Sequence, residues 1–201
     1  MSNRRKEKIM KKIPFDKFPH IEADEIVLRK TTPADIDALF EVYNNEKLFQ
    51  YTPSIFKETK EEVAELIEYF NRQFEDKQMI RMAVTLKSEG DIAVDVAEMY
   101  GYNADVNMIA IGYRVSERFW GRRIATKSVN TMVKFLFEEI GINRIYAEAM
   151  PIHTASLAVL EKCGFMREGV ARQGFYFHDK GVVDGVTYSV LKSDYFRGGT
   201  N

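Results

Sequence analysis

Apolar residues recur along this chain with two different periods. A period of two, which is typical of β-strands, marks residues 26–29, 79–86, 92–99, 109–115 and 144–150, and two further segments on either side of a turn at 179–181. A period of three to four, which is typical of amphipathic helices, marks residues 32–43, 59–74, 124–140 and 156–163. The segment 44–57 predicts a loop.

Capping residues support these helix limits. Thr32 precedes Pro33 and an acidic first turn, the segment Thr59 to Glu62 has the form of a capping box, and Gly141 ends the third helix. The element order β-α-α-β-β-β-α-β-α-β-β predicts an α/β (α+β) fold. In it, four helices flank a mixed, mostly antiparallel, twisted sheet of about seven strands.

Length and composition predict a single domain. The chain has 201 residues, of which 45% are hydrophobic, enough for one well-packed core and too few for two full domains. We expect this domain to span residues 25–195. Residues 1–24 form a basic N-terminal tail and lead-in, and residues 196–201 form a C-terminal tail. A basic tail of this kind is more often a solvated chain end than an RNA contact.

Charge and cysteine content narrow the class of protein. A net charge of -1 does not favour attraction to nucleic acid or an anionic membrane, so direct nucleic-acid binding is not expected. The single cysteine, Cys163, excludes an intramolecular disulfide and a cysteine-based zinc site, and no metal is expected. No apolar run has the length of a membrane helix. These features favour a cytoplasmic protein.

Residues 109–124 carry the clearest functional signal. They pass from a strand, through a turn with Gly121 and three arginines, into the third helix. The first amides of a helix have no partner within the helix, and the helix dipole is positive at this end. A strand, a cationic turn and a helix N-terminus together predict a site for an anion such as a diphosphate.

Five short strings carry a resemblance to a known family. They are Glu25-Ile-Val-Leu-Arg29 with Asp35; Ile111-Gly-Tyr-Arg-Val-Ser116; Phe119-Trp-Gly-Arg-Arg-Ile-Ala-Thr126; Ser156-x-x-Val-Leu-Glu-Lys-Cys-Gly-Phe165; and Glu168-Gly169 followed by Asp184 and Tyr188. Their order and spacing resemble the GNAT superfamily of N-acetyltransferases. The strings look most like its RimJ/RimL branch, which acetylates N-terminal amines of ribosomal proteins.

The resemblance implies acetyl-CoA as co-substrate. In this family the pantetheine arm pairs with strand backbone, here Tyr113, Arg114 and Val115. The diphosphate binds the following loop, here Trp120, Gly121, Arg122, Arg123, Ile124, Ala125 and Thr126. The family has glycine where this chain has Arg123. If that position needs a positive φ, a side chain costs about 1–2 kcal/mol, which a bond from Arg123 to phosphate, roughly 1.5–3 kcal/mol, would offset. Alternatively, the side chains of Arg122 and Arg123 both point to solvent, and the loop has drifted from the family pattern.

A second departure lies before the fourth helix, where the family pattern Asn-x-x-Ser is replaced by His153-Thr-Ala-Ser156. The family asparagine bonds the pantetheine or caps the helix. His153 could bond the pantetheine, cap the helix, or titrate near neutrality and act as a catalytic base. Ser156 takes the family serine position, so we expect it to bind the cofactor and to protonate the leaving thiolate. It could equally be an ordinary first-turn hydroxyl.

Transfer of an acetyl group from a thioester needs a neutral amine, a polarised carbonyl and a protonated leaving group. Candidate bases are Glu98, Asp95 and Glu148. Strand parity puts Asp95 and Glu98 on opposite faces of the sheet, so at most one of these two faces the cleft. Each carboxylate could instead be solvated or salt-bridged. The places where some relatives carry a catalytic glutamate and tyrosine hold Phe175 and Leu160 here.

We therefore expect an acetyl-CoA-dependent N-acetyltransferase that acts by direct transfer on a primary amine. A protein N-terminus, such as that of a ribosomal protein, is favoured, because an α-amine with pKa about 7.7–8.0 loses its proton more easily than a lysine at about 10.4. Two alternatives stay open: acetylation of a small amine such as an antibiotic or polyamine, and a non-catalytic acyl-CoA-binding module. The aromatic run Phe175-Tyr176-Phe177 would line the acceptor pocket, or form core or a homodimer surface.

Overall fold

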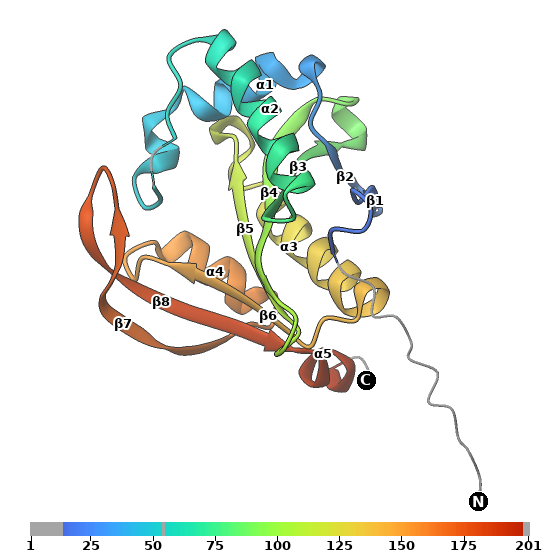
Figure 1. Cartoon of the computed structure of the whole chain (residues 1–201), viewed down its shortest axis with the longest axis vertical. Helices are drawn as coiled ribbons and strands as arrows, with labels where there is room; N and C mark the ends of the chain where they lie inside the picture. Colours follow the sequence, from blue (N-terminus) through green and yellow to red (C-terminus); the bar gives the residue numbers. More distant parts are fainter. Residues whose placement is uncertain (1–13, 54, 199–201) are drawn as a thin grey trace, which may run out of the picture.

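An eight-stranded sheet forms the centre of the molecule (Figure 1). The structure is a computed structural model, and it describes residues 14–53 and 55–198. The strand order of the sheet is β1-β2-β3-β4-β5-β6-β8-β7, and all neighbours are antiparallel except β5 and β6. The strands are β1 Ile21–Glu22, β2 Ile26–Lys30, β3 Met79–Leu86, β4 Ala93–Asn103, β5 Met108–Val115, β6 Arg144–Ala149, β7 Met166–Phe177 and β8 Gly181–Leu191. The basic segment 1–12 and residues 199–201 lie outside the described residues.

Five α-helices accompany the sheet: α1 Ile36–Tyr43, α2 Lys60–Glu75, α3 Ile124–Lys134, α4 Thr154–Lys162 and α5 Lys192–Gly198. Short 3-10 turns lie at Pro33–Asp35, Glu46–Phe49, Lys87–Glu89 and Glu117–Phe119, and α3 continues as a π-helix at Phe135–Ile140. Within the described ranges, none of the helices has the length and apolar character that crossing a membrane requires.

The predicted mixed, mostly antiparallel fold is confirmed, with one strand and one helix more than expected. The two-residue β1 is too short to show a period in sequence, and α5 is anchored mainly by Tyr195, whose ring lies 5.2 Å from that of Phe137. Phe15 and Ile21, in the segment expected to be an irregular lead-in, are buried in the core. The domain limits 25–195 stay a prediction, and elements on both sides of them pack against the core.

Two of the sequence signals, the capping box at Thr59 and the string with Arg29 and Asp35, correspond to hydrogen bonds in the structure. The capping box at α2 is present, with the Glu62 amide donating to Thr59 Oγ1 at 3.2 Å and the Thr59 amide donating to Glu62 Oε2 at 3.1 Å. The pairing of Arg29 with Asp35 in the first string joins β2 to the start of α1. Two guanidinium nitrogens donate to the buried carboxylate, each at 2.8 Å.

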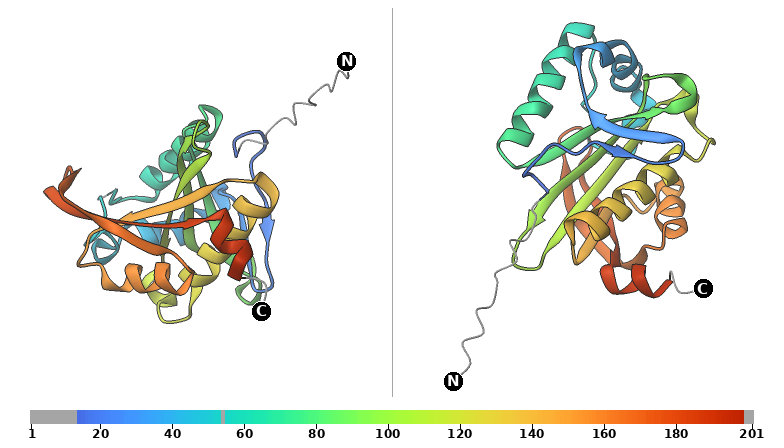
Figure 2. Two further views of the ribbon diagram at one scale, coloured as in Figure 1. Left: turned by 90° about the horizontal axis from the view of Figure 1, so that it is seen from below. Right: turned by 90° about the vertical axis from the view of Figure 1, so that its right-hand side faces the viewer.

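Helices cover both faces of the sheet (Figure 2). Helices α1 and α2 pack on one face, and α3 and α4 pack side by side on the other. Strands β5 and β6 pair only from Met108–Ala110 to Arg144–Tyr146 and then diverge, as Figure 1 shows. From Ile111 onward, one edge of β5 therefore has no strand beside it. This gap positions the site.

Asp95 ties β4, β5 and α3 together at the end of the gap. Its carboxylate is fully buried and accepts hydrogen bonds from Ser128 Oγ of α3 at 2.7 Å and from the Arg114 amide at 2.9 Å. Glu98 lies on the opposite face, where it pairs with Arg81. The predicted parity is confirmed, and Asp95 is a structural carboxylate.

Asp95 should make stability depend on pH. Burial raises its pKa from 3.8 to about 6, so the folded protein binds this proton more tightly than the unfolded chain does. The resulting stabilisation is complete below about pH 4 and is lost as pH rises through about 6. We expect the free energy of unfolding of the wild type, relative to Asp95→Asn, to fall by on the order of 3 kcal/mol across this range. Urea unfolding at several pH values measures it, and a constant difference would contradict it.

Candidate active site

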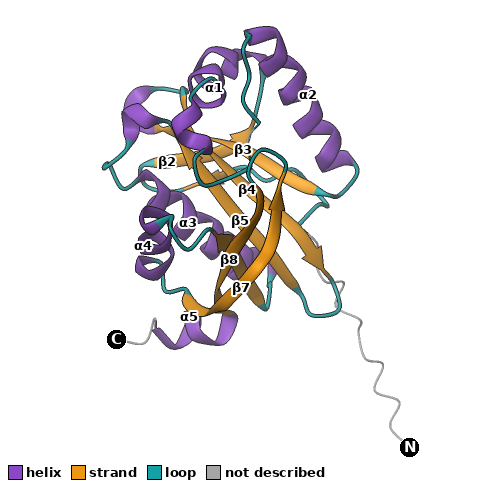
Figure 3. Ribbon diagram, turned by 90° about the vertical axis from the view of Figure 1, so that its left-hand side faces the viewer, coloured by secondary structure: helices purple, strands orange, loops and turns teal. Residues whose placement is uncertain are grey.

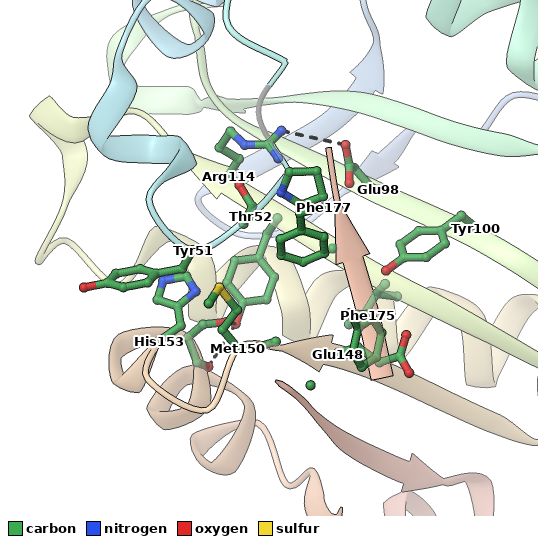
Figure 4. Close-up of a pocket in the computed structure, with 18 of the residues that line it drawn as sticks. Tyr51, Thr52, Glu98, Tyr100, Arg114, Glu148, Met150, His153, Phe175 and Phe177 are labelled. Atoms are coloured by element: carbon green, nitrogen blue, oxygen red, sulfur yellow. Dashed lines mark hydrogen bonds and ion pairs between the residues drawn. The ribbon is translucent and has the colours of Figure 1, made fainter. Parts of the chain in front are cut away.

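A cavity of about 350 Å³ opens where β5 and β6 diverge (Figure 4). Its walls come from β4, β5, β6, the start of α4, the loop around Tyr51 and the β7–β8 hairpin. Six of the residues predicted for the site meet in these walls: Glu98, Tyr113, Arg114, Glu148, His153 and Ser156. Val115 and the loop from Trp120 to Thr126 do not line the cavity; they lie at the far end of β5 and at the start of α3.

The open edge of β5 presents backbone groups to the gap. The Ser116 amide donates to the Val94 carbonyl at 2.9 Å, and the Arg114 amide donates to Asp95, so both point toward β4. Backbone groups alternate in direction along a strand, and those of Tyr113 and Val115 therefore point into the gap. The Arg114 amide, which was expected to contact the cofactor, is committed to Asp95 instead.

The loop after β5 has the left-handed backbone that its family pattern implies. Gly121 has φ 75° and Arg123 has φ 60°. The condition considered for position 123, a positive φ, is met in the structure. Arg123 is exposed and precedes the first α3 residue, Ile124, without a side-chain cap. The early amides of α3 are thus available to an anion.

Two side chains of this loop make hydrogen bonds to neighbouring segments. The Trp120 indole donates to the Val115 carbonyl at 3.0 Å, which ties the loop to the open end of β5. Arg122 Nη2 donates to Glu89 Oε1 at 3.0 Å, so of the two loop arginines this one has a partner on the β3–β4 turn. These two hydrogen bonds link the loop to the end of β5 and to the turn between β3 and β4.

Ser156 shares a hydrogen-bonded pair with Tyr113. The two side-chain hydroxyls are 2.9 Å apart, and the tyrosine hydroxyl also donates to the Ser156 carbonyl at 3.1 Å. Burial raises the pKa of Tyr113, so its hydroxyl keeps its proton near neutral pH. From the sequence, only the backbone of Tyr113 was expected to contribute to the site. The pair places two exchangeable protons beside the gap, near the buried Leu160 that stands where relatives have a tyrosine.

His153 stacks on Tyr51, which lies in the loop between α1 and α2. Its ring lies 4.7 Å from that of Tyr51 at an angle of 29°, and it makes no capping hydrogen bond to α4, so the capping role is wrong. Burial lowers the pKa of His153, which keeps the ring neutral near pH 7. Lys180, at the tip of the β7–β8 hairpin, donates to the Thr52 carbonyl at 2.9 Å and holds this loop over the cavity.

The two candidate bases differ in their surroundings. Glu98 accepts a hydrogen bond from Arg81 Nε at 2.9 Å and lies 3.9 Å from Arg114 Nη1. No ion pair joins Glu148 to any residue that the structure describes, and its side chain is open to the cavity. Partial desolvation raises the pKa of Glu148, and a hydrogen bond from the Thr187 side chain opposes this shift only in part. Glu148 is therefore the carboxylate that is freer to accept a proton.

Figure 3 shows the β7–β8 hairpin. A bulge in this hairpin places an aromatic ring in the cavity wall. The register shifts between Ala171 and Phe175, and the Gln173 amide, at φ 51°, donates to Asp184 Oδ1 at 2.7 Å. The Phe175 ring then lies directly over Gly185, where a Cβ atom would come within 1.6 Å of it. Of the aromatic run, Phe175 and Phe177 line the cavity, whereas Tyr176 is 70% exposed.

Gly185→Ala should disturb this wall. The added methyl group would displace the Phe175 ring, and we expect about a tenfold loss of kcat/KM for the amine, with little change in KM for acetyl-CoA. Gly169→Ala is the matched control, because a Cβ there meets nothing within 4 Å. Thiol-release kinetics measure both variants. Equal behaviour of the two would show that the Phe175 ring does not shape the acceptor site.

The part of the chain that the structure describes holds no cluster of three histidine, cysteine, aspartate or glutamate side chains that could bind a metal ion. Cys163 is half-buried, and burial raises its pKa to about 11. Its thiol is therefore protonated near neutral pH and poorly suited to nucleophilic attack.

Comparison with known proteins agrees with this geometry. The family model described as acetyltransferase (GNAT) domain matches residues 25–166. Among similar sequences, the N-acetyltransferase YoaA of Bacillus subtilis, itself uncharacterized, is 27% identical over 176 residues, covering 87% of this chain and 98% of its own. YdaF of the same organism, named as a candidate ribosomal N-acetyltransferase, is 28% identical over 181 residues, covering 86% and 94%.

A solved structure shares the fold. The ribosomal L7/L12 α-N-protein acetyltransferase RimL, in complex with coenzyme A, superposes with a TM-score of 0.74 at 18% identity, covering 86% of this chain and 98% of its own. At this identity the likeness concerns the fold alone.

Proposed function

The chain belongs to the GNAT acetyltransferase family, whose model covers residues 25–166, and from this premise we propose that it acetylates the N-terminal α-amine of a protein. As a member of the family it is an acyltransferase, an acetyl-CoA-dependent N-acetyltransferase. The choice of a protein N-terminus over other amines is the step that needs support from the site.

The observation that carries this choice is the state of Glu148. It is a cavity carboxylate with no ion pair to a described residue, and partial burial raises its pKa. Such a base suits an α-amine, whose pKa of about 7.7–8.0 leaves a sizeable neutral fraction at pH 7. A lysine with pKa about 10.4 would need a stronger device. The name of RimL gives an α-N-protein acceptor, and that of YdaF gives a ribosomal one.

The residues of the gap fit acetyl-CoA. The backbone of Tyr113 and Val115 would pair with the pantetheine arm, and the first amides of α3 would bind the diphosphate. His153 and Ser156 stand at the cavity where the family has its Asn-x-x-Ser, so they stay candidates for contacts to the same arm. Bound acetyl-CoA supplies the activated carbonyl.

Proton transfers then fall to side chains on opposite sides of the gap. Glu148 would take a proton from the amine, directly or through a water molecule, as nitrogen attacks the carbonyl carbon. The C–N bond forms and the C–S bond breaks. The Ser156–Tyr113 pair would donate a proton to the departing thiolate. CoA would then leave as a neutral thiol, so no free thiolate charge would form in a desolvated site.

A ribosomal protein as acceptor would place the enzyme in the cytoplasm. This location and the acceptor are proposals, and a homodimer stays a prediction.

A thiol-release assay tests the function. We expect release of CoA with acetyl-CoA and short peptides that have a free N-terminus. The same peptides with an acetylated N-terminus and an internal lysine should release none. Release with polyamines or lysine side chains alone would favour the small-amine alternative. Acetyl-CoA binding by calorimetry without release across a broad amine panel would favour the non-catalytic module.

A further inference from the structure

Arg114 is a buried cation in the cavity wall. Its side chain is 11% exposed, and two of its nitrogen atoms, Nε and Nη1, are buried with no hydrogen-bond acceptor among the described residues. The guanidinium lies over the rings of Phe49 and Tyr43, with its carbon 5.2 Å and 5.8 Å from their centroids. Burying a charged group is costly unless it is paired, and this one is paired weakly.

The nearest carboxylate is already shared. Glu98 Oε1 lies 2.9 Å from Arg81 Nε but 3.9 Å from Arg114 Nη1, which is too long for a hydrogen bond. Both arginine side chains are nearly buried, at 13% and 11% exposure. This wall of the cavity therefore holds two guanidinium groups and one carboxylate, an excess of one positive charge. The other carboxylate that acts on Arg114, that of Asp95, lies on the opposite face of the sheet and does not line the cavity.

The negative charges of the cavity lie elsewhere. Figure 4 shows Arg114 and Glu98 at one end of the cavity and Glu148 at the other, with the rings of Phe175 and Phe177 between them. Asp184 also lines the cavity, but its carboxylate accepts a hydrogen bond from the Gln173 amide in the hairpin bulge. The cavity is therefore polarised, with a cationic wall facing a carboxylate that would receive the amine.

We propose that the preferred acceptor carries a carboxylate close to its primary amine and that Arg114 binds this carboxylate. On the proposed function, on which this inference rests, the acceptor is a protein N-terminus with Asp or Glu at its first or second position. A carboxylate brings the single negative charge that the wall lacks, whereas a phosphate would bring nearly two. The aromatic rings would pack on the stem that joins amine and acid.

Matched peptides test the inference. One pair differs by Asp or Asn at position one, and another by Glu or Gln at position two. We expect the acidic member to have at least about a tenfold higher kcat/KM, and a correspondingly lower Kd in calorimetry with the CoA-loaded protein. Arg114→Met should reduce this ratio to about one, and Arg114→Lys should keep part of it. Because a ratio is compared, any common loss of activity cancels.

Arg118→Gln is the charge-matched control. Arg118 is half-exposed, pairs with Glu41 outside the cavity, and should leave the ratio unchanged. Equal use of acidic and neutral peptides by the wild type, or an acidic preference that survives Arg114→Met, would overturn the inference. Binding of free aspartate but of no peptide would overturn the assignment to a protein N-terminus. Failure to release CoA with every peptide would count against the proposed function, and the calorimetric ratio would still decide the role of Arg114.

Discussion

Replacing Glu148 by glutamine is expected to lower kcat for an N-terminal peptide by about 10²–10⁴-fold, the usual contribution of a general base. The glutamine amide keeps the size of the side chain but cannot accept the amine proton. Thiol release at saturating acetyl-CoA measures the loss. The wild-type rate should also rise with pH through a limb above the ordinary carboxyl range, because the pKa of Glu148 is raised, and this limb should vanish in the variant.

Glu98→Gln is the matched comparison, since it makes the same chemical change in the same cavity. The Glu98 carboxylate is engaged by Arg81, so we expect a smaller loss of kcat and a retained pH limb. A larger loss for Glu98→Gln than for Glu148→Gln would reverse the two roles. Equal, small losses would mean that water alone removes the proton.

Gly121→Val is expected to abolish CoA binding. Gly121 has φ 75°, a conformation that a β-branched residue avoids, and the loop would have to change its backbone path. A Cβ at this position meets nothing within 4 Å, so the cause would be backbone strain and not a steric clash. Calorimetric titration with CoA measures the effect, with circular dichroism to show that the protein stays folded.

Arg123→Gly is the control in the same loop. Arg123 already has φ 60°, so glycine should relieve roughly 1–2 kcal/mol of backbone strain while leaving the amides in place. We expect a slightly more stable protein whose CoA binding is kept or modestly weakened, depending on any bond from the lost guanidinium to phosphate. Normal CoA binding by Gly121→Val would show that the diphosphate binds elsewhere.

The order of elements could be predicted from sequence because it depends on local signals. Alternation and three-to-four periodicity mark the strands and helices, and Thr59 and Gly141 mark two helix ends. Parity placed Asp95 and Glu98 on opposite faces, since strand side chains alternate. The family glycine at position 123 raised the question of a positive φ there, and the folded backbone answers it with φ 60°.

The pairings within the cavity depended on the folded chain. Tyr113 and Ser156 are 43 residues apart in sequence, and only the divergence of β5 from β6 brings α4 beside the strand. The stacking of Tyr51 on His153 joins a loop and a helix that have no local signal in common. The bulge that turns Phe175 over Gly185 breaks the strand period, so alternation could not reveal it.

The sequence by itself thus determined the fold class, the strand–turn–helix that suits a diphosphate, and a short set of possible bases. The tertiary structure decided which of them is paired and which is open. Arg81 reaches Glu98 across the β3–β4 ladder, while Glu148 lies beyond the point where β5 leaves β6. Charge pairing depends on distances between strands and on burial, and neither quantity is encoded in the period of a single strand.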